Sequence, residues 1–265
     1  MITEATVRAV RKPQTARLEP TRTFRPLEHF EVLDLVEGEM NKAGLVVDNS
    51  SPAGKRFTLV DGQAKMVAVL PLTLKIDDQS RMMVGIMNSW NKTLALRVGF
   101  GAEVFVCSNG SIFATEVVGR KHTTEILADL PTLLAAALSK VGLYADAQCK
   151  FFERLRNVPM TDNEVNDFVV RSAIDHDCIT GGEIIHVINE WRNPRFDEFK
   201  PRTAYSLHNA YTEISKRIAV KNGGSHAERT VRLSQLFVDR FAADLGIKTI
   251  WQPEIEENLQ VLENN

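Results

Sequence analysis

The sequence predicts an α+β fold: an N-terminal helix, an antiparallel β-meander sheet, and then packed C-terminal helices. Three observations lead to this class. Apolar residues recur at helical spacing over 27–43, short apolar runs between turn residues fill 45–122, and helical spacing returns after His122. Strands do not alternate with helices, and neither a GxGxxG nor a P-loop motif occurs, which disfavours nucleotide-binding folds. We expect the helices to cover one face of a curved sheet.

The chain divides into an arm, one folded domain and a tail. Residues 1–27 contain three prolines and six basic side chains against two acidic ones, so we expect an extended basic arm. Residues 28–250 are expected to form a single α+β domain, β-rich over 45–122 and helical over 123–250. Residues 251–265 form an acidic tail. Such ends can contact polyanions and partners, or each other in a neighbouring subunit, or be merely solvated.

The β-rich region is predicted to contain seven short strands in one antiparallel meander. Asp61-Gly62 is the turn of one hairpin, because glycine tolerates the positive φ that two-residue turns require. Asn109-Gly110 is expected to form a similar turn, with Cys107 near the hairpin tip. The predicted strands are 45–48, 56–60, 64–75, 81–88, 93–100, 103–108 and 111–118.

The helical region is predicted from apolar residues at intervals of three and four. Gly44 is expected to end the first helix of the chain, and Pro131 to divide a later pattern into a short helix and a longer one. Thr161 and Glu164 have the spacing of a capping box. Asn222–Ser225 predicts a flexible break. The expected C-terminal helices lie within 125–143, 144–156, 164–173, 184–191, 204–219 and 228–245.

Composition is that of an ordinary globular protein and favours a cytoplasmic location. The net charge is −2, so binding of a polyanion would require an uneven distribution of charge. No apolar run approaches the roughly 20 residues of a membrane span, and no hydrophobic region follows the N-terminal arginines. Cys107, Cys149 and Cys178 are widely spaced, which argues against a disulfide framework and against a structural zinc site.

Two basic segments are candidate nucleic-acid contacts. Arg120–Thr123 lies where a strand ends and a helix begins, and Thr123 or Thr124 can cap that helix to form an anion site beside two cations. Residues 190–202 interleave aromatic and basic side chains, which suits single-stranded nucleic acid because rings stack on bases and cations contact phosphates. The alternatives are a solvated strand end and a loop anchored to the core. The candidate nucleic-acid-binding residues are Lys92, Arg97, Arg120, Lys121, His122, Trp191, Arg192, Arg195 and Phe196.

Enzymatic chemistry is the least favoured class. Cys107 and His122 would lie far apart along a strand unless the sheet curls, and a lone cysteine is more often a buried structural residue. His208 has no convergent nucleophile, so a hydrogen-bonded polar seam between helices is favoured there. Asp175–Cys178, followed by His186, has metal-ligand residue types without a ligand spacing. We therefore expect no catalytic residue, no metal and no cofactor.

Five ordered motifs resemble those of a known family. They are Met87–Ser89, Leu94–Val98, Val106–Gly110, Arg120–Thr123 and Leu207–Glu213. Over roughly residues 28–220 the chain resembles the phage- and plasmid-encoded proteins grouped as domain-of-unknown-function family 932. The family has no established chemistry and no agreed catalytic residue. The resemblance implies a mobile-element setting, in which handling of single-stranded DNA, replication and host defence are frequent functions.

The order of helix, meander and long helix is also similar to that of phage single-strand-annealing proteins, which assemble as rings or filaments around a basic groove. On this fold-level analogy we expect a homo-oligomer that binds single-stranded DNA in annealing-type recombination or replication. The alternative is a protein–protein interaction or assembly factor of a phage or plasmid. That factor would act on a host or phage complex without binding nucleic acid.

Overall fold

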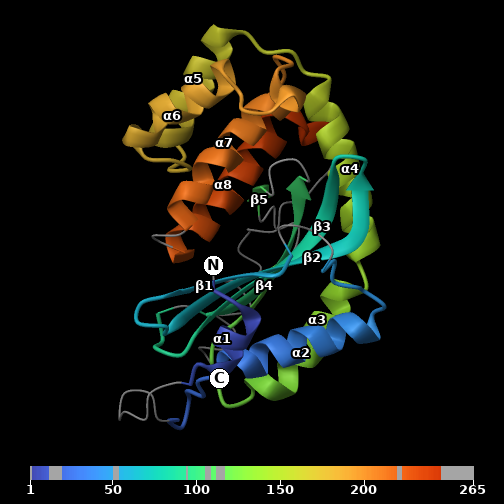
Figure 1. Ribbon diagram of the computed structural model, residues 1–265, viewed down its shortest axis with the longest axis vertical. Coiled ribbons are helices and arrows are strands. Elements are labelled where there is room, and N and C mark those ends of the chain that lie inside the picture. Colours follow the sequence, from blue (N-terminus) through green and yellow to red (C-terminus); the bar gives the residue numbers. More distant parts are fainter. Residues whose placement is uncertain are drawn as a thin grey trace.

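In the computed structural model, an antiparallel sheet lies between two layers of helices (Figure 1). The structure describes residues 2–11, 20–49, 54–93, 95–104, 109–111, 117–219 and 223–245. Helices α1 to α3 lie on one side of the sheet and α5 to α8 on the other. Strand β3 (Ser80–Ser89) is buried at every residue, which requires cover on both faces. The α+β class is confirmed, whereas the expectation of helices on one face is wrong.

Four strands follow one another in the order β1-β2-β3-β4, and the far edge of β4 carries two short strands. β5 pairs with one end of β4 through Ala102–Val104, and β6 pairs with the other end through Leu96–Gly99. β4 runs without interruption through Gly101, where the sequence predicted a turn. The bounds of the other strands are Arg56–Val60 for β1, Lys65–Asp77 for β2, Leu96–Val104 for β4, Asn109–Ser111 for β5 and Val117–Arg120 for β6.

The two predicted hairpin turns have different outcomes. Asp61 and Gly62 both have positive φ, at 56° and 60°, and the turn lies between β1 and β2 as predicted. The loop spans four residues, 61–64, and not the two that were predicted, because Val60 pairs with Lys65. Asn109-Gly110 instead pairs with β4 as part of β5, so the turn expected there is wrong. Cys107 lies outside the described residues. The predicted strand 45–48 is reduced to one bridge between Val47 and Leu72.

The N-terminal arm is not wholly extended. Residues Glu4–Ala9 form the short helix α1, whose Val7 is fully buried, and Arg8 forms ion pairs with Asp34 and Glu37 of α2. The buried apolar contact and these ion pairs hold a helix where the prolines of the arm predicted extended chain. α2 (His29–Lys42) is followed by Gly44 at φ +72°, which confirms the predicted helix end.

The C-terminal helices differ from the prediction at two breaks. Pro131 lies inside α3, and the chain breaks instead at Ser139-Lys140, between α3 and α4. Gly223–Ser225 begins α8 and is not a loop. The capping box of Thr161 and Glu164 is confirmed at the start of α5. The bounds are Ile126–Leu138 for α3, Val141–Arg156 for α4, Asp162–Ile174 for α5, Gly181–Arg192 for α6, Ala204–Ala219 for α7 and Gly223–Phe241 for α8.

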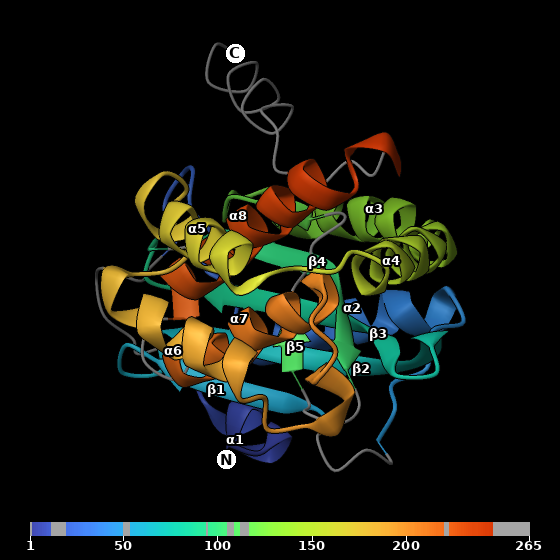
Figure 2. The same ribbon diagram turned by 90° about the horizontal axis from the view of Figure 1, so that it is seen from above.

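The two faces of the sheet differ in chemistry. Successive side chains of a strand point to opposite faces, and Asn88 marks the face toward α2 because its amide lies 2.9 Å from Nδ1 of His29. That face is apolar, with Val84 and Ile86 of β3 fully buried on it. The opposite face carries Arg81 and Glu103, together with glycines of β3 and β4. Figure 2 looks onto the helices over this second face, where α7 packs against β5.

No single helix within the described ranges is both long and apolar enough to cross a membrane. The consecutive helices α3 and α4 reach that length and apolar character only when taken together, and they are bent by 48° at the break between them.

Candidate nucleic-acid interface

The arm meets the end of β6 through a backbone hydrogen bond. The N–H of Arg25 donates to the carbonyl oxygen of His122, with 2.9 Å between the two atoms. Phe24 is buried beside this contact, with its ring centroid 6.1 Å from that of His122 in an edge-on arrangement. This contact holds Phe24 and Arg25 of the arm beside the residues that connect β6 to α3.

The loop between β3 and β4 reaches the same place. Lys92 has a φ of +65°, and its ammonium lies 4.5 Å from the centroid of the Phe24 ring. A cation over an aromatic face is worth about 0.5–1 kcal/mol at an exposed site. The loop conformation is supported by Asn91, whose side-chain oxygen accepts hydrogen bonds from the hydroxyl of Ser89 and from the N–H of Thr93.

Four exposed cations lie on the segments that meet at the buried Phe24, and we call them the arm patch. They come from the arm, the β3–β4 loop and the residue after β6, and they are Arg22, Arg25, Lys92 and Lys121. Among the described residues, Arg22, Arg25 and Lys92 form no ion pair with a carboxylate. The carboxylates of two neighbouring segments are already engaged, because Asp61 pairs with Lys65 and Asp129 pairs with Arg120. Arg22, Arg25 and Lys92 of the arm patch therefore present exposed positive charge to an anionic ligand.

Arg97 and Arg120 lie on opposite faces of the sheet. In the β4–β6 pair, Arg120 is opposite Leu96 and Arg97 is opposite Gly119. These two pairs are adjacent along the strands, and adjacent pairs direct their side chains to opposite faces of the sheet. The side chain of Arg120 forms an ion pair with Asp129 of α3. Neither arginine therefore belongs to the arm patch.

His122 contributes to the interface through its carbonyl group and not through a charged ring. Its side chain is buried, and burial lowers the pKa of the imidazole to about 4. The ring is neutral near pH 7. The predicted cap by Thr123 or Thr124 is wrong, because the N-cap residue of α3 is Glu125 and the cap has no side-chain hydrogen bond. Binding of an anion at this helix start stays a prediction.

The aromatic and basic segment 190–202 does not offer a stacking surface at Trp191. The residue is 2% exposed, its indole N–H donates to Asp162, and the guanidinium carbon of Arg202 lies 5.2 Å from the ring centroid. The prediction that a base stacks on Trp191 is wrong, because the ring is already covered on its faces by protein atoms. Phe196 is partly buried and packs edge-on against Phe199, with 5.9 Å between centroids.

The cations of this segment are paired with carboxylates. Nη1 of Arg195 lies 2.7 Å from Oε1 of Glu213, and its Nε lies 3.4 Å from Oε2 of Glu190. Nε of Arg192 lies 3.9 Å from Oδ2 of Asp162. This group lies among α5, α6 and α7, across the sheet from the arm (Figure 1). The structure thus brings Lys92, Lys121 and the backbone of His122 together, and leaves the residues of 191–196 elsewhere.

The groups considered for catalysis are buried in apolar surroundings. His208 packs between the rings of Phe152 and Phe237, and burial lowers its pKa to about 3. Burial likewise raises the pKa of the Cys178 thiol to about 12. In the part of the chain that the structure describes, no three His, Cys, Asp or Glu side chains gather in a geometry that could hold a metal ion.

The sequence indicated a basic arm but did not single out Arg22 and Arg25. Their position beside Lys92 depends on the hydrogen bond from Arg25 to His122, which joins residues 97 positions apart in the chain. The only sequence signal is that both arginines flank an aromatic residue, Phe24, in an otherwise polar segment.

Comparison with known proteins gives one finding. No curated protein and no solved structure matches the chain. The family model described as Domain of unknown function (DUF932) matches residues 23–237. This range includes most of the apolar core, all of the described strands and three of the four cations of the arm patch, Arg25, Lys92 and Lys121. The chain therefore belongs to the DUF932 family.

Proposed function

We propose that this protein binds single-stranded DNA through the arm patch, as an annealing-type recombination or replication protein of a phage or plasmid. It acts as a homo-oligomer in the host cytoplasm. The observation that carries the proposal is the meeting of the arm and the β3–β4 loop at the buried Phe24, which brings the exposed cations Arg22, Arg25 and Lys92 together beside the end of β6. Clustered lysine and arginine side chains are the electrostatic footprint of a nucleic-acid-binding surface.

The chemistry of the arm patch favours contacts to phosphates over contacts to bases. Its cations are exposed, and its aromatic residue Phe24 is buried beneath them. Binding is therefore expected to be independent of base sequence and strongly dependent on salt. For four phosphate contacts, the affinity for a single strand falls by about 50-fold between 50 and 200 mM salt.

The proposal is tested by fluorescence anisotropy with labelled oligo(dT) of 30 nucleotides and nuclease-treated protein. An R25E/K92E double variant is expected to lose at least tenfold in affinity at 50 mM salt. The matched control is K42E/K200E, which makes the same change of charge at two exposed lysines of α2 and of the loop before α7. It is expected to stay within about twofold of the wild type. The proposal would be overturned if the two variants lost equal affinity for oligo(dT), or if the affinity of the wild type did not change with salt concentration.

The alternative function, a protein–protein interaction or assembly factor, rests on exposed apolar side chains of α5 and α6. Ile174 is 75% exposed, Ile185 is 55% exposed and Val170 is 39% exposed. This alternative predicts a stable complex that forms without nucleic acid. Because both functions predict an assembly, binding of oligo(dT) by nuclease-treated protein distinguishes them: salt-dependent binding contradicts the alternative, and an oligomer in light scattering that does not bind oligo(dT) contradicts the first proposal.

A further inference from the structure

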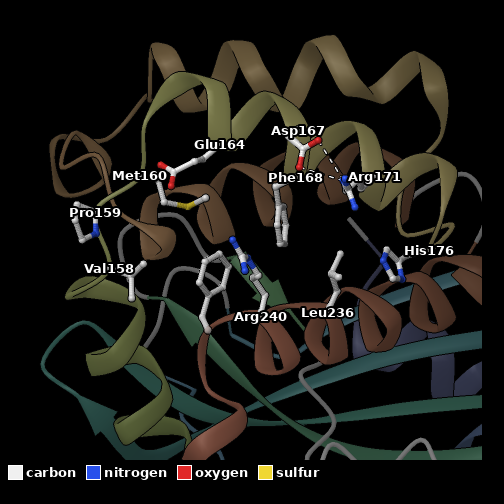
Figure 3. Close-up of a pocket in the computed structure, with 11 residues that line it drawn as sticks. Val158, Pro159, Met160, Glu164, Asp167, Phe168, Arg171, His176, Leu236 and Arg240 are labelled. Carbon is white, nitrogen blue, oxygen red and sulfur yellow. Dashed lines mark hydrogen bonds and ion pairs between the residues drawn. The ribbon is translucent and has the colours of Figure 1, made fainter.

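A cavity of about 650 Å³ opens between α5, α8 and the residues that precede α5 (Figure 3). This volume lies within the range of pockets that hold small organic ligands. The cavity lies among the helices that cover the second face of the sheet, whereas the arm patch lies at the end of β6 and beside α2. It is therefore separate from the surface proposed to bind nucleic acid.

The wall of the cavity is part apolar and part charged, and the apolar part is built from aromatic and aliphatic side chains of α5 and α8. Phe168 of α5 and Phe241 of α8 approach to 5.6 Å between ring centroids, and Phe237 supports both from behind at 5.0 and 5.6 Å. Leu236 and Met160 complete this lining. Leu236 and Phe241 are partly buried, so apolar surface remains open to a ligand. Rigid rings beside a flexible thioether suit a flat or branched apolar body.

The charged groups around the cavity are not equivalent. Glu164 accepts hydrogen bonds from the N–H and the hydroxyl of Thr161, at 2.8 and 2.7 Å, and Asp167 pairs with Arg171. Both carboxylates that line the cavity are thus occupied by neighbours. Hydrogen bonds from Thr161 and the charge of Arg240 lower the pKa of Glu164, but the exposed Arg240 forms no ion pair within the described residues. Figure 3 shows its side chain extending toward the space between Met160 and Phe168. An anionic group can therefore bind Arg240 without breaking a bond inside the protein.

We propose that this cavity binds a small amphipathic anion. The carboxylate, sulfonate or phosphate of the ligand contacts the Arg240 guanidinium, and its aromatic or branched apolar body lies between Phe168, Phe241 and Leu236. A guanidinium presents a planar fork of N–H donors that matches such oxyanions, and the apolar side chains beside it contact the rest of the ligand. This binding activity goes beyond nucleic-acid binding and does not depend on it.

The test uses two fluorescent probes of similar shape and different charge on the full chain. The anionic probe is 8-anilinonaphthalene-1-sulfonate and the neutral one is N-phenyl-1-naphthylamine. Each is expected to bind the folded protein with a stoichiometry of one and to compete with the other. R240Q is expected to lower the affinity for the anionic probe by about tenfold and the affinity for the neutral probe by less than twofold, because only the charge-assisted hydrogen bond is lost.

Two further variants complete the design. K150Q removes an exposed cation of α4 that does not line the cavity and is expected to change neither probe's affinity by more than about twofold. L236W places an indole at the apolar wall, narrows the cavity and is expected to weaken binding of both probes by at least tenfold. Binding of the anionic probe that is unaffected by R240Q, or unchanged binding of both probes by a folded L236W protein, overturns the proposal.

Discussion

The Arg81 guanidinium and the Glu103 carboxylate face each other across β3 and β4, with 2.7 Å between Nη2 and Oε2. Their side chains are only 4% and 1% exposed, and Glu103 also accepts a hydrogen bond from Arg56. Charges removed from water to this extent are tolerated only when paired, so each partner depends on the other. The polar face of the sheet is thus built around a buried ionic network.

Glu103→Ala is expected to lower the free energy of unfolding by about 3–5 kcal/mol, because it leaves two guanidinium groups without this carboxylate. Urea denaturation measures the change. Asp167→Ala, which removes an exposed pair with Arg171, serves as the control and is expected to cost less than about 1 kcal/mol. Similar losses in the two variants would contradict the stabilising role of the network.

Stability is expected to fall as the pH decreases from about 6.5 toward 4. Burial lowers the pKa of His122 to about 4 and that of His208 to about 3, from 6.5 in the unfolded chain. In this window the unfolded state binds more protons than the folded state, so the free energy of unfolding decreases by about 1.4 kcal/mol per pH unit for each histidine. Urea titrations at pH 7, 6 and 5 measure the slope. His122→Leu should reduce it, and an unchanged slope would show that His122 does not contribute.

Two glycines six positions apart are expected to respond to alanine with opposite signs. Gly44 has a φ of +72°, so Gly44→Ala is expected to cost about 1–2 kcal/mol. Gly38 lies within α2, where an added Cβ would meet nothing within 4 Å, and Gly38→Ala is expected to stabilise by about 0.5–1 kcal/mol. Thermal unfolding midpoints measured side by side distinguish the two positions. A shift in the same direction would contradict the conformational explanation.

Trp191→Ala is expected to reduce stability and to leave binding unchanged. Truncation of a buried tryptophan costs about 3–5 kcal/mol through the cavity that it leaves. Under conditions in which the variant is folded, its affinity for oligo(dT) is expected to stay within about twofold of the wild type. A tenfold loss would instead place Trp191 at the nucleic acid.

Local signals in the sequence predicted the elements whose causes lie within a few residues. The capping box of Thr161 and Glu164, the turn at Asp61-Gly62 and the end of α2 at Gly44 all depend on neighbours in the chain, and all are confirmed. The turn expected at Asn109-Gly110 is wrong, because pairing with β4 overrides the local preference of that dipeptide.

The sequence by itself determined the α+β class, most of the strands and helices, and the presence of basic side chains in the arm. Tertiary structure alone decided which of those side chains meet. Exposure of Lys92 beside Arg25, and burial of Trp191 beneath Arg202, depend on how remote segments pack. The physical reason is that backbone conformation responds to adjacent residues, whereas the accessibility and charge environment of a side chain are set by whatever the fold places against it.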